Sequence, residues 1–167
     1  MIRLTNLADY AVVLMCHLAH HRHDVHNAAD LASDTMIPVP TVSKILGALS
    51  RAGLLRSQRG VKGGFSMTRP AADITVADII EAVDGPIALT NCIEDAPGDC
   101  NLEPVCAMRT HWQTINGAVK QALAGITLAE IAAPVPLGPV PTKFDLAAHA
   151  ADDSIGHRTD HPGVNKE

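Results

Sequence analysis

The sequence predicts a mainly α-helical chain with a small β-wing, that is, a winged helix-turn-helix followed by a long dimerisation helix. Apolar residues recur at helical spacing along much of the chain. A short, basic and glycine-rich hairpin follows the third predicted helix, which is the order of a winged helix-turn-helix. Aromatic residues make up only 2% of the 167 residues, so aliphatic side chains must build the core, and this favours helices.

Two helices are predicted in the first part of the chain. The apolar positions of residues 6–20 recur every three or four residues, as they do on one face of a helix. Asn27 can cap a short helix over residues 28–34, because its side-chain oxygen can accept a hydrogen bond from an N–H of the first turn. We expect the connector between them, HHRHDVH, to be a solvated segment rather than a metal site.

A third helix is predicted over residues 41–52, after a tight turn at residues 36–39. Pro40 suits the first helical position, where its missing N–H needs no partner, and Gly53 can end the helix.

A two-stranded hairpin, the wing, is predicted next. Its strands are expected at residues 54–58 and 65–68, on either side of the turn RGVKGG. Glycines in this turn would let the backbone approach a duplex closely, and an arginine at a wing tip can enter a minor groove. Taken alone, the turn could also be an ordinary solvent-exposed loop.

Two further helices, a loop and a last short helical turn, Leu128 to Ala132 capped by Thr127, are predicted after the wing. Thr75 and Asp78 form a capping box that begins a short helix, and a polar loop follows at residues 87–103. Pro104 can begin the longest helix, about residues 104–124. The apolar seam of this helix comprises Trp112, Ile115, Val119, Ala122 and Ile126. Its spacing fits a contact between partner helices, although the same face could pack on its own domain.

This order of elements predicts four regions. They are a winged helix-turn-helix DNA-binding domain (1–70), a connecting helix with a cysteine loop (71–103), a dimerisation helix (104–133) and a disordered tail (134–167). The tail is predicted from composition, because it is proline-rich and then polar without periodicity.

Charge is distributed unevenly along the chain. The formal net charge is −5, which by itself argues against binding to nucleic acid. Residues 1–70 carry eight Lys or Arg and four acidic residues, whereas residues 71–167 carry five and fourteen. The resulting +4 and −9 fit DNA binding at one end of the chain, with ordinary charge scatter as the alternative.

The candidate DNA-contacting residues lie on the third helix and in the wing turn. In a helix-turn-helix, the N-terminal residues of the second helix of the pair reach base edges in the major groove. Short hydroxyl side chains can bond to bases or phosphates, and basic side chains can neutralise phosphates. The candidates are Pro40, Thr41, Ser43, Lys44, Arg59 and Lys62.

Three of the four cysteines are close together in the sequence, with the spacing C-x7-C-x5-C. Cys92, Cys100 and Cys106 could turn their thiolates to one point and bind zinc, copper or an iron–sulfur cluster. The wide spacing favours a cluster over a zinc finger, with thiol redox sensing or inert thiols as alternatives. Cys16 stands apart on an apolar helix face and is expected to be buried.

Three cysteines leave a fourth ligand position open. His111 and Glu94 are candidates near the cysteines, and Asp9 is a more distant acidic candidate. Arg109 is a poor ligand because its guanidinium stays protonated.

Other classes of protein are disfavoured. No apolar run reaches the roughly 18 residues that a membrane span requires, and the N-terminal segment lacks a small-residue cleavage site. We therefore expect a cytoplasmic protein with no membrane partner. An enzyme is not expected, because no nucleophile–base pair is evident and Gly60–Gly64 lacks the lysine and serine that end a Walker motif.

Taken together, these motifs resemble the Rrf2 family of bacterial iron–sulfur transcriptional regulators, of the IscR and NsrR type. The resemblance rests on MIRLTNLADYAV, IPVPTVSKILGALSRAGLLRSQRGVKGGF, ITVADIIEAVDGP and the three downstream cysteines, and covers about residues 1–133. The subgroup that regulates the SUF cluster-assembly genes looks most similar. The resemblance implies a homodimer that binds a double-stranded DNA operator, with long helices crossing between subunits.

The same resemblance implies roles for individual residues. Cys92, Cys100 and Cys106 would hold a 2Fe–2S or 4Fe–4S cluster near the dimer interface, and Arg59 would lie in the DNA-contacting wing. The first two cysteines are separated by seven residues, where the family commonly has five.

The chain also departs from the family at the fourth ligand. Arg109 stands where IscR-type members carry their ligand histidine. Asp9 matches the acidic ligand that NsrR-type members donate from the other subunit, and is therefore favoured over His111. Ser43 replaces an acidic residue often found on the recognition helix, so the DNA sequence that is read could differ.

The sequence thus predicts a transcriptional regulator, and more specifically a repressor of iron–sulfur cluster-assembly genes that responds to cluster status. A nitric-oxide or redox sensor of the same family is an alternative. So is a zinc-stabilised or cluster-free DNA-binding or interaction protein.

Overall fold

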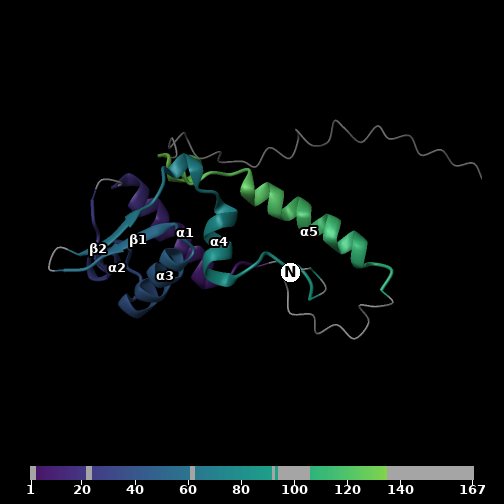
Figure 1. Ribbon diagram of the computed structural model, residues 1–167, viewed down its shortest axis with the longest axis horizontal. Coiled ribbons are helices and arrows are strands. Elements are labelled where there is room, and N and C mark those ends of the chain that lie inside the picture. The colour runs from purple at the N-terminus through teal and green to yellow at the C-terminus, as the bar shows by residue number, and fades with distance from the viewer. Residues whose placement is uncertain (1–2, 22–23, 61–62, 92, 94–105, 135–167) are drawn as a thin grey trace, which may run out of the picture. The chain divides into compact units, whose positions relative to one another are not determined.

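The computed structural model describes residues 3–21, 24–60, 63–91, 93 and 106–134. The chain divides into two units, Met1–Ala133 and Pro134–Glu167, and every described helix and strand belongs to the first. In chain order these elements are α1 (Asn6–His20), α2 (Ala28–Thr35), α3 (Val39–Arg51), β1 (Leu55–Gln58), β2 (Gly64–Met67), the 3-10 helix η1 (Ala71–Asp73), α4 (Val76–Asp84), α5 (Arg109–Ala124) and α6 (Leu128–Ala132). The predicted fold class, mainly α with a small β-wing, is confirmed (Figure 1). The predicted tail lies outside the described residues from residue 135 on.

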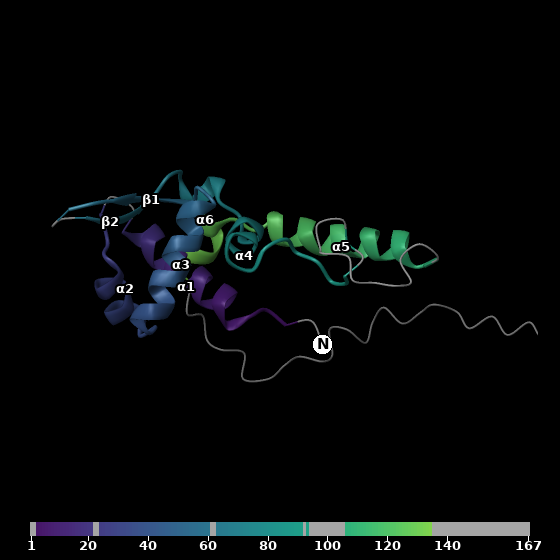
Figure 2. The same cartoon turned by 60° about the horizontal axis from the view of Figure 1, so that its bottom comes forward.

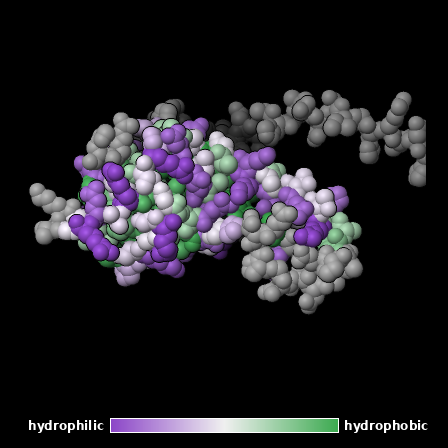
Figure 3. Space-filling view, in the orientation of Figure 1, coloured by the Kyte–Doolittle hydropathy of each residue, from purple (hydrophilic) through white to green (hydrophobic). Residues whose placement is uncertain are grey.

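Aliphatic side chains of three helices form the core. α1, α3 and α4 pack against one another and lie side by side in Figures 1 and 2. Leu14 and Met15 of α1, Ile45 of α3 and Ile79 of α4 are completely buried. Hydrophilic side chains cover much of the face of this helical body that Figure 3 shows. None of the helices in the described ranges combines the length and apolar character needed to cross a membrane.

The turn between α2 and α3 differs in detail from the prediction. α3 begins at Val39, because Pro38 takes the extended conformation of an N-cap, and Pro40 occupies the second helical position instead of the first. Met36 makes the turn with φ at 60°, a left-handed backbone conformation that residues other than glycine rarely adopt. Gly53 follows α3 with φ at 76°, as expected for a residue that ends a helix.

The wing has a third contributor that the sequence pattern did not reveal. β1 and β2 pair antiparallel, with Ser57 opposite Phe65. Outside the hairpin, Phe65 also exchanges two backbone hydrogen bonds with His26, at 3.1 and 2.8 Å. Gly64 makes this approach possible, because a Cβ at that position would lie 2.4 Å from the His26 carbonyl oxygen. The connector that was expected to be solvated is therefore attached to the wing at its last residue, His26.

α4 and α6 each begin with a capping box, and a backbone bridge joins their starts. The predicted box of Thr75 and Asp78 at the start of α4 is present, and Thr127 and Glu130 form a second one at the start of α6. The backbones of Thr75 and Thr127 pair as a short antiparallel bridge. Leu128 is completely buried, so the end of the first unit is packed into its core.

α5 is shorter than predicted at its N-terminal end. It begins at Arg109, and residues 106–108 form a turn ahead of it, whereas Pro104 lies outside the described residues. Asn116 is the one buried residue of α5. The side chains of Ile115 and Ile126 in the predicted apolar seam are 44% and 42% exposed. The chain therefore leaves much of this seam uncovered.

Candidate functional site

The predicted DNA-reading residues fall on and beside one face of α3. Val39, Pro40, Ser43 and Lys44 are exposed, and their spacing of three and four residues places them along one side of the helix. Thr41 is half-buried, and its N–H is already bonded within the turn. The structure therefore groups Ser43 and Lys44 with Val39, which the sequence did not single out.

Two arginines extend the positive charge beyond the predicted residues. Arg51 is exposed at the end of α3, seven residues after Lys44 and so on the same side of the helix. Arg56 is exposed on β1, where its Nε donates a hydrogen bond to Ser66 Oγ at 3.0 Å. No motif marks either residue in the sequence. The seven-residue spacing of Lys44 and Arg51 does indicate that both lie on the same side of the helix.

The wing turn presents Arg59 at the surface. Its side chain is exposed, whereas Lys62 lies outside the described residues. The Gly63 N–H donates to the Gly60 carbonyl at 2.9 Å, and a Cβ at Gly63 would lie 2.4 Å from the Gln58 carbonyl oxygen. The tight turn therefore requires glycine at position 63, and it fixes the backbone next to Arg59.

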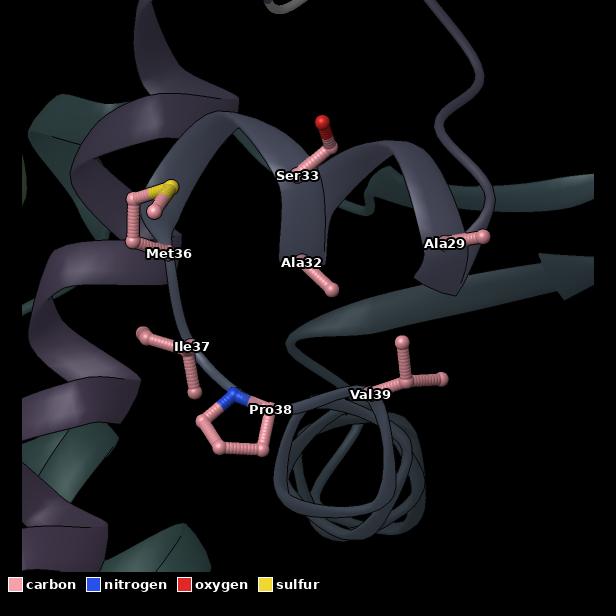
Figure 4. A pocket seen from close by; sticks show the side chains of 7 residues that line it. All are labelled: Ala29, Ala32, Ser33, Met36, Ile37, Pro38 and Val39. Atoms are coloured by element: carbon pink, nitrogen blue, oxygen red, sulfur yellow. The ribbon is translucent and has the colours of Figure 1, made fainter.

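A hollow of about 400 Å³ lies between α2 and the start of α3 (Figure 4). Six of its seven lining residues are apolar, and Ser33 is the exception. In Figure 4, Ala32 of α2 and Val39 of α3 point toward the hollow, whereas the Ser33 hydroxyl points away from it. The hollow therefore continues the exposed face of α3 as an apolar surface.

One of the three clustered cysteines can be placed. Cys106 is a half-buried free thiol three residues before α5, and its carbonyl accepts a hydrogen bond from the Arg109 N–H at 3.3 Å. Cys92 and Cys100, and the candidate ligand Glu94, lie outside the described residues. Within the described ranges, no group of three or more His, Cys, Asp or Glu side chains could hold a metal ion.

The two candidates for the fourth ligand are both accessible. Asp9 is exposed in the first turn of α1, and no hydrogen bond or ion pair engages its carboxylate within the described part of the chain. His111 is exposed in the first turn of α5. Cys16, expected to be buried, is half-buried on α1, and this burial raises the pKa of its thiol.

Asn116 fastens the segment before Cys92 to α5. Its side-chain oxygen accepts from the Leu89 N–H at 3.0 Å, and its Nδ2 donates to the Ile87 carbonyl at 2.8 Å. Nearby, Lys120 of α5 and Glu81 of α4 form an ion pair at 2.7 Å. Cys106 lies three residues ahead of the same helix, so α5 holds the chain before Cys92 through Asn116 and continues the chain after Cys106. Nothing in the sequence indicates this role of Asn116, because a single amide side chain in an amphipathic helix is common.

Three histidines pack together where α1 meets the wing strand. The ring centroid of His17 lies 5.0 Å from that of His21 and 5.8 Å from that of His26, and the His21 and His26 centroids are 5.7 Å apart. His17 Nε2 also lies 3.3 Å from an Asp34 carboxylate oxygen of α2. Burial lowers the pKa of His17, the neighbouring His21 lowers it further, and Asp34 opposes this shift.

Comparison with known proteins identifies this combination of helices and wing. A family model described as "Rrf2: Iron-dependent Transcriptional regulator" matches residues 4–134. The HTH-type transcriptional regulator IscR of Photobacterium profundum is 30% identical over 163 residues, which cover 96% of this chain and 94% of that protein. IscR of Vibrio atlanticus is 31% identical over 131 residues, which cover 78% and 75% of the two chains.

Solved structures show the same likeness. CymR, the global cysteine regulator of B. subtilis, superposes with a TM-score of 0.62 at 27% identity, over 79% of this chain and 97% of that chain. IscR of T. potens superposes with a TM-score of 0.59 at 24% identity, over 78% of this chain and 85% of that chain. At this identity the comparison shows a similar fold. These relatives are transcriptional regulators and not enzymes, in agreement with the sequence prediction. The chain therefore belongs to the Rrf2 family of DNA-binding transcriptional regulators.

Proposed function

We propose that this regulator is a cytoplasmic homodimer that represses iron–sulfur cluster-assembly genes according to cluster status. Cys92, Cys100 and Cys106 would hold the cluster, with Asp9 of the partner subunit as fourth ligand. Operator DNA would be contacted by Pro40, Thr41, Ser43 and Lys44 of α3 and by Arg59 and Lys62 of the wing.

The double attachment of the cysteine segment to α5 carries this proposal. Asn116 holds Ile87 and Leu89, just before Cys92, and Cys106 leads through a short turn into α5. α5 packs on α4, and α4 packs on α3, which bears the DNA-reading face. A change in what the cysteines bind would therefore act on helices in direct contact with the reading helix.

The donor set suits an iron–sulfur cluster. Thiolates are the usual ligands of such clusters, and Cys106 is a free, partly accessible thiol. The Asp9 carboxylate is exposed and unpaired within the described residues, so a partner subunit could reach it. When bound, a cluster would supply reversible electron transfer and ligand exchange at these thiolates.

The exposed seam of α5 supports dimerisation. Ile115 on α5 is a large aliphatic residue that this chain leaves 44% exposed. Met108 and Ile126, just outside the two ends of the helix, are 49% and 42% exposed. Large apolar side chains that stay exposed along and beside a helix are typical of a protein–protein contact. A second copy of the chain would cover them through its own α5.

Anaerobic purification followed by iron and acid-labile sulfide analysis tests the cluster. We expect both elements in the wild type, their loss in Cys106→Ser, and their retention in Cys16→Ser, which removes the thiol outside the proposed site. A colourless wild type without iron and sulfide after reconstitution would rule out the cluster. Zinc in its place would indicate a structural metal site.

The fourth ligand is tested by a second pair of variants. We expect Asp9→Ala to change the visible absorption spectrum of the cluster and to speed its loss, whereas His111→Ala leaves both unchanged. The reverse pattern would transfer the role to His111.

DNA binding is tested by measuring affinity for the assembly-gene promoter at several salt concentrations. We expect affinity to fall steeply as the salt concentration rises. Arg59→Ala should reduce the slope of log affinity against log salt concentration by about one, because one phosphate contact is lost. Binding that does not depend on salt would contradict the proposed contacts.

A further inference from the structure

The start of the recognition helix exposes large apolar side chains. Met36 in the turn is 87% exposed and Val39 at the first helical position is 46% exposed. Together with Ala32 they border the hollow between α2 and α3 (Figure 4). An exposed Met36 in a left-handed conformation is unfavourable for the isolated chain, so a partner that covers it would offset part of this cost.

This helix start is also poor in hydrogen-bond donors. Pro38 and Pro40 have no N–H, and the Thr41 N–H donates to the Pro38 carbonyl at 2.9 Å. Val39 therefore supplies the one N–H of the first turn that is left for a partner. Helix N-termini that bind phosphate present several such groups, so this one is not suited to the DNA backbone.

The position of the hollow points to double-stranded DNA as its occupant. Val39 precedes Ser43 by one helical turn, so the hollow is continuous with the face that carries Ser43 and Lys44. The Lys44 side chain supplies a positive charge beside it that suits DNA. This step rests on the proposed binding of α3 in the major groove.

In the major groove, an apolar side chain has one specific partner among the base edges, namely the C5 methyl group of thymine. We infer that Met36 and Val39 form an apolar site for a thymine methyl group, and that this site selects thymine at one position of each operator half-site. The remaining affinity would come from Lys44 and the wing.

The test replaces thymine by deoxyuridine, which lacks only the methyl group. An operator would first be selected from random duplexes with the full-length protein, and each thymine would then be replaced singly in both half-sites. We expect one position at which binding weakens about fourfold per half-site, the effect of removing one buried methyl group. At that position Val39→Ala should bind the two DNAs almost equally.

Two variants serve as controls. Lys44→Ala should weaken binding to both DNAs and retain the preference for thymine. Val13→Ala removes a comparably exposed valine of α1 and should leave affinity and preference unchanged. Met36→Ala provides a second reduction of the site and should lower the preference as Val39→Ala does.

The outcomes separate this inference from the proposed function. Absence of salt-dependent binding to any duplex would contradict DNA binding by α3 itself. Binding without a methyl-sensitive thymine, or a Val39→Ala variant that keeps the full preference, would overturn the thymine site alone. A change in the sedimentation of Val39→Ala without DNA would assign the hollow to a protein contact and would also overturn it.

Discussion

The Thr5 hydroxyl lies 2.9 and 2.7 Å from the two carboxylate oxygens of Asp84, a residue 79 positions away in the sequence. The same hydroxyl accepts a hydrogen bond from the Ala8 N–H at 3.1 Å and so caps α1. The start of α1, which carries Asp9, is thereby fixed to the end of α4, from which the chain continues toward Cys92.

Thr5→Ala should lower the free energy of unfolding by about 1 kcal/mol, because the helix loses its cap and its link to Asp84. Thr5→Ser keeps a hydroxyl and should remain within a few tenths of a kcal/mol of the wild type. Urea unfolding followed by circular dichroism measures both variants. Equal stability of the alanine and serine variants would show that the hydroxyl contributes nothing.

Asn116→Ala should lower the free energy of unfolding by about 1–3 kcal/mol, because the Leu89 N–H and the Ile87 carbonyl would lose their partner in a partly buried site. Gln121→Ala is the matched control, since it removes an exposed amide from the same helix and should change stability by less than about 0.5 kcal/mol. Hydrogen exchange at the Leu89 amide should accelerate only in Asn116→Ala. Unchanged exchange there would contradict the proposed attachment.

Gly64→Ala should destabilise the wing by about 2 kcal/mol, because the new methyl would push His26 away and break two backbone hydrogen bonds. Gly117→Ala offers the opposite result, since nothing lies within 4 Å of a Cβ there and alanine in mid-helix stabilises by about 0.5–1 kcal/mol. Thermal unfolding distinguishes the two. Gly64→Ala should also weaken DNA binding, and a fully stable variant would exclude the tight approach of His26.

Stability should fall as the pH drops below about 6.5, the ordinary pKa of histidine. Burial and the neighbouring histidines lower the pKa of His17, so below pH 6.5 the unfolded chain binds the proton that the folded chain resists. The loss continues as the pH falls to the lowered pKa, and stability is retained above 6.5. Urea unfolding between pH 5 and 8 measures this slope.

Variants at the histidine cluster show which residue causes this dependence of stability on pH. His17→Gln should flatten it, and His111→Gln, which changes an exposed histidine of α5, should not. Asp34→Asn should extend the loss to lower pH, because the Asp34 charge normally raises the pKa of His17. An unchanged slope in His17→Gln would assign the pH dependence to other groups.

Local chemistry explains which parts of the fold were predictable. Asn27 and Thr75 cap helices through bonds to residues at most three positions away, so their neighbours in the sequence are enough to reveal them. The pairing of His26 with Phe65 joins distant residues at a single point and leaves no alternating pattern. The start of α3 was misplaced because two prolines, Pro38 and Pro40, could each mark it.

The same distinction applies to the candidate site. The cysteines and Arg59 carry spacing signals, and Lys44 lies on a helix whose exposed face is periodic. Asn116 acts through backbone groups that any residue could provide, so nothing in the sequence identifies its partners. Val39 was overlooked because an aliphatic residue at a helix start usually belongs to the core, and here it faces outward.

The two prolines around Val39 have a consequence for how such a regulator could change its targets. They remove hydrogen-bond donors that would otherwise fasten the start of α3 to phosphates. In the proposed complex, general affinity and choice of sequence would therefore depend on different residues. Substitutions at Met36 or Val39 could then redirect the protein to new promoters in a single evolutionary step. The strength with which it holds DNA would be inherited almost unchanged.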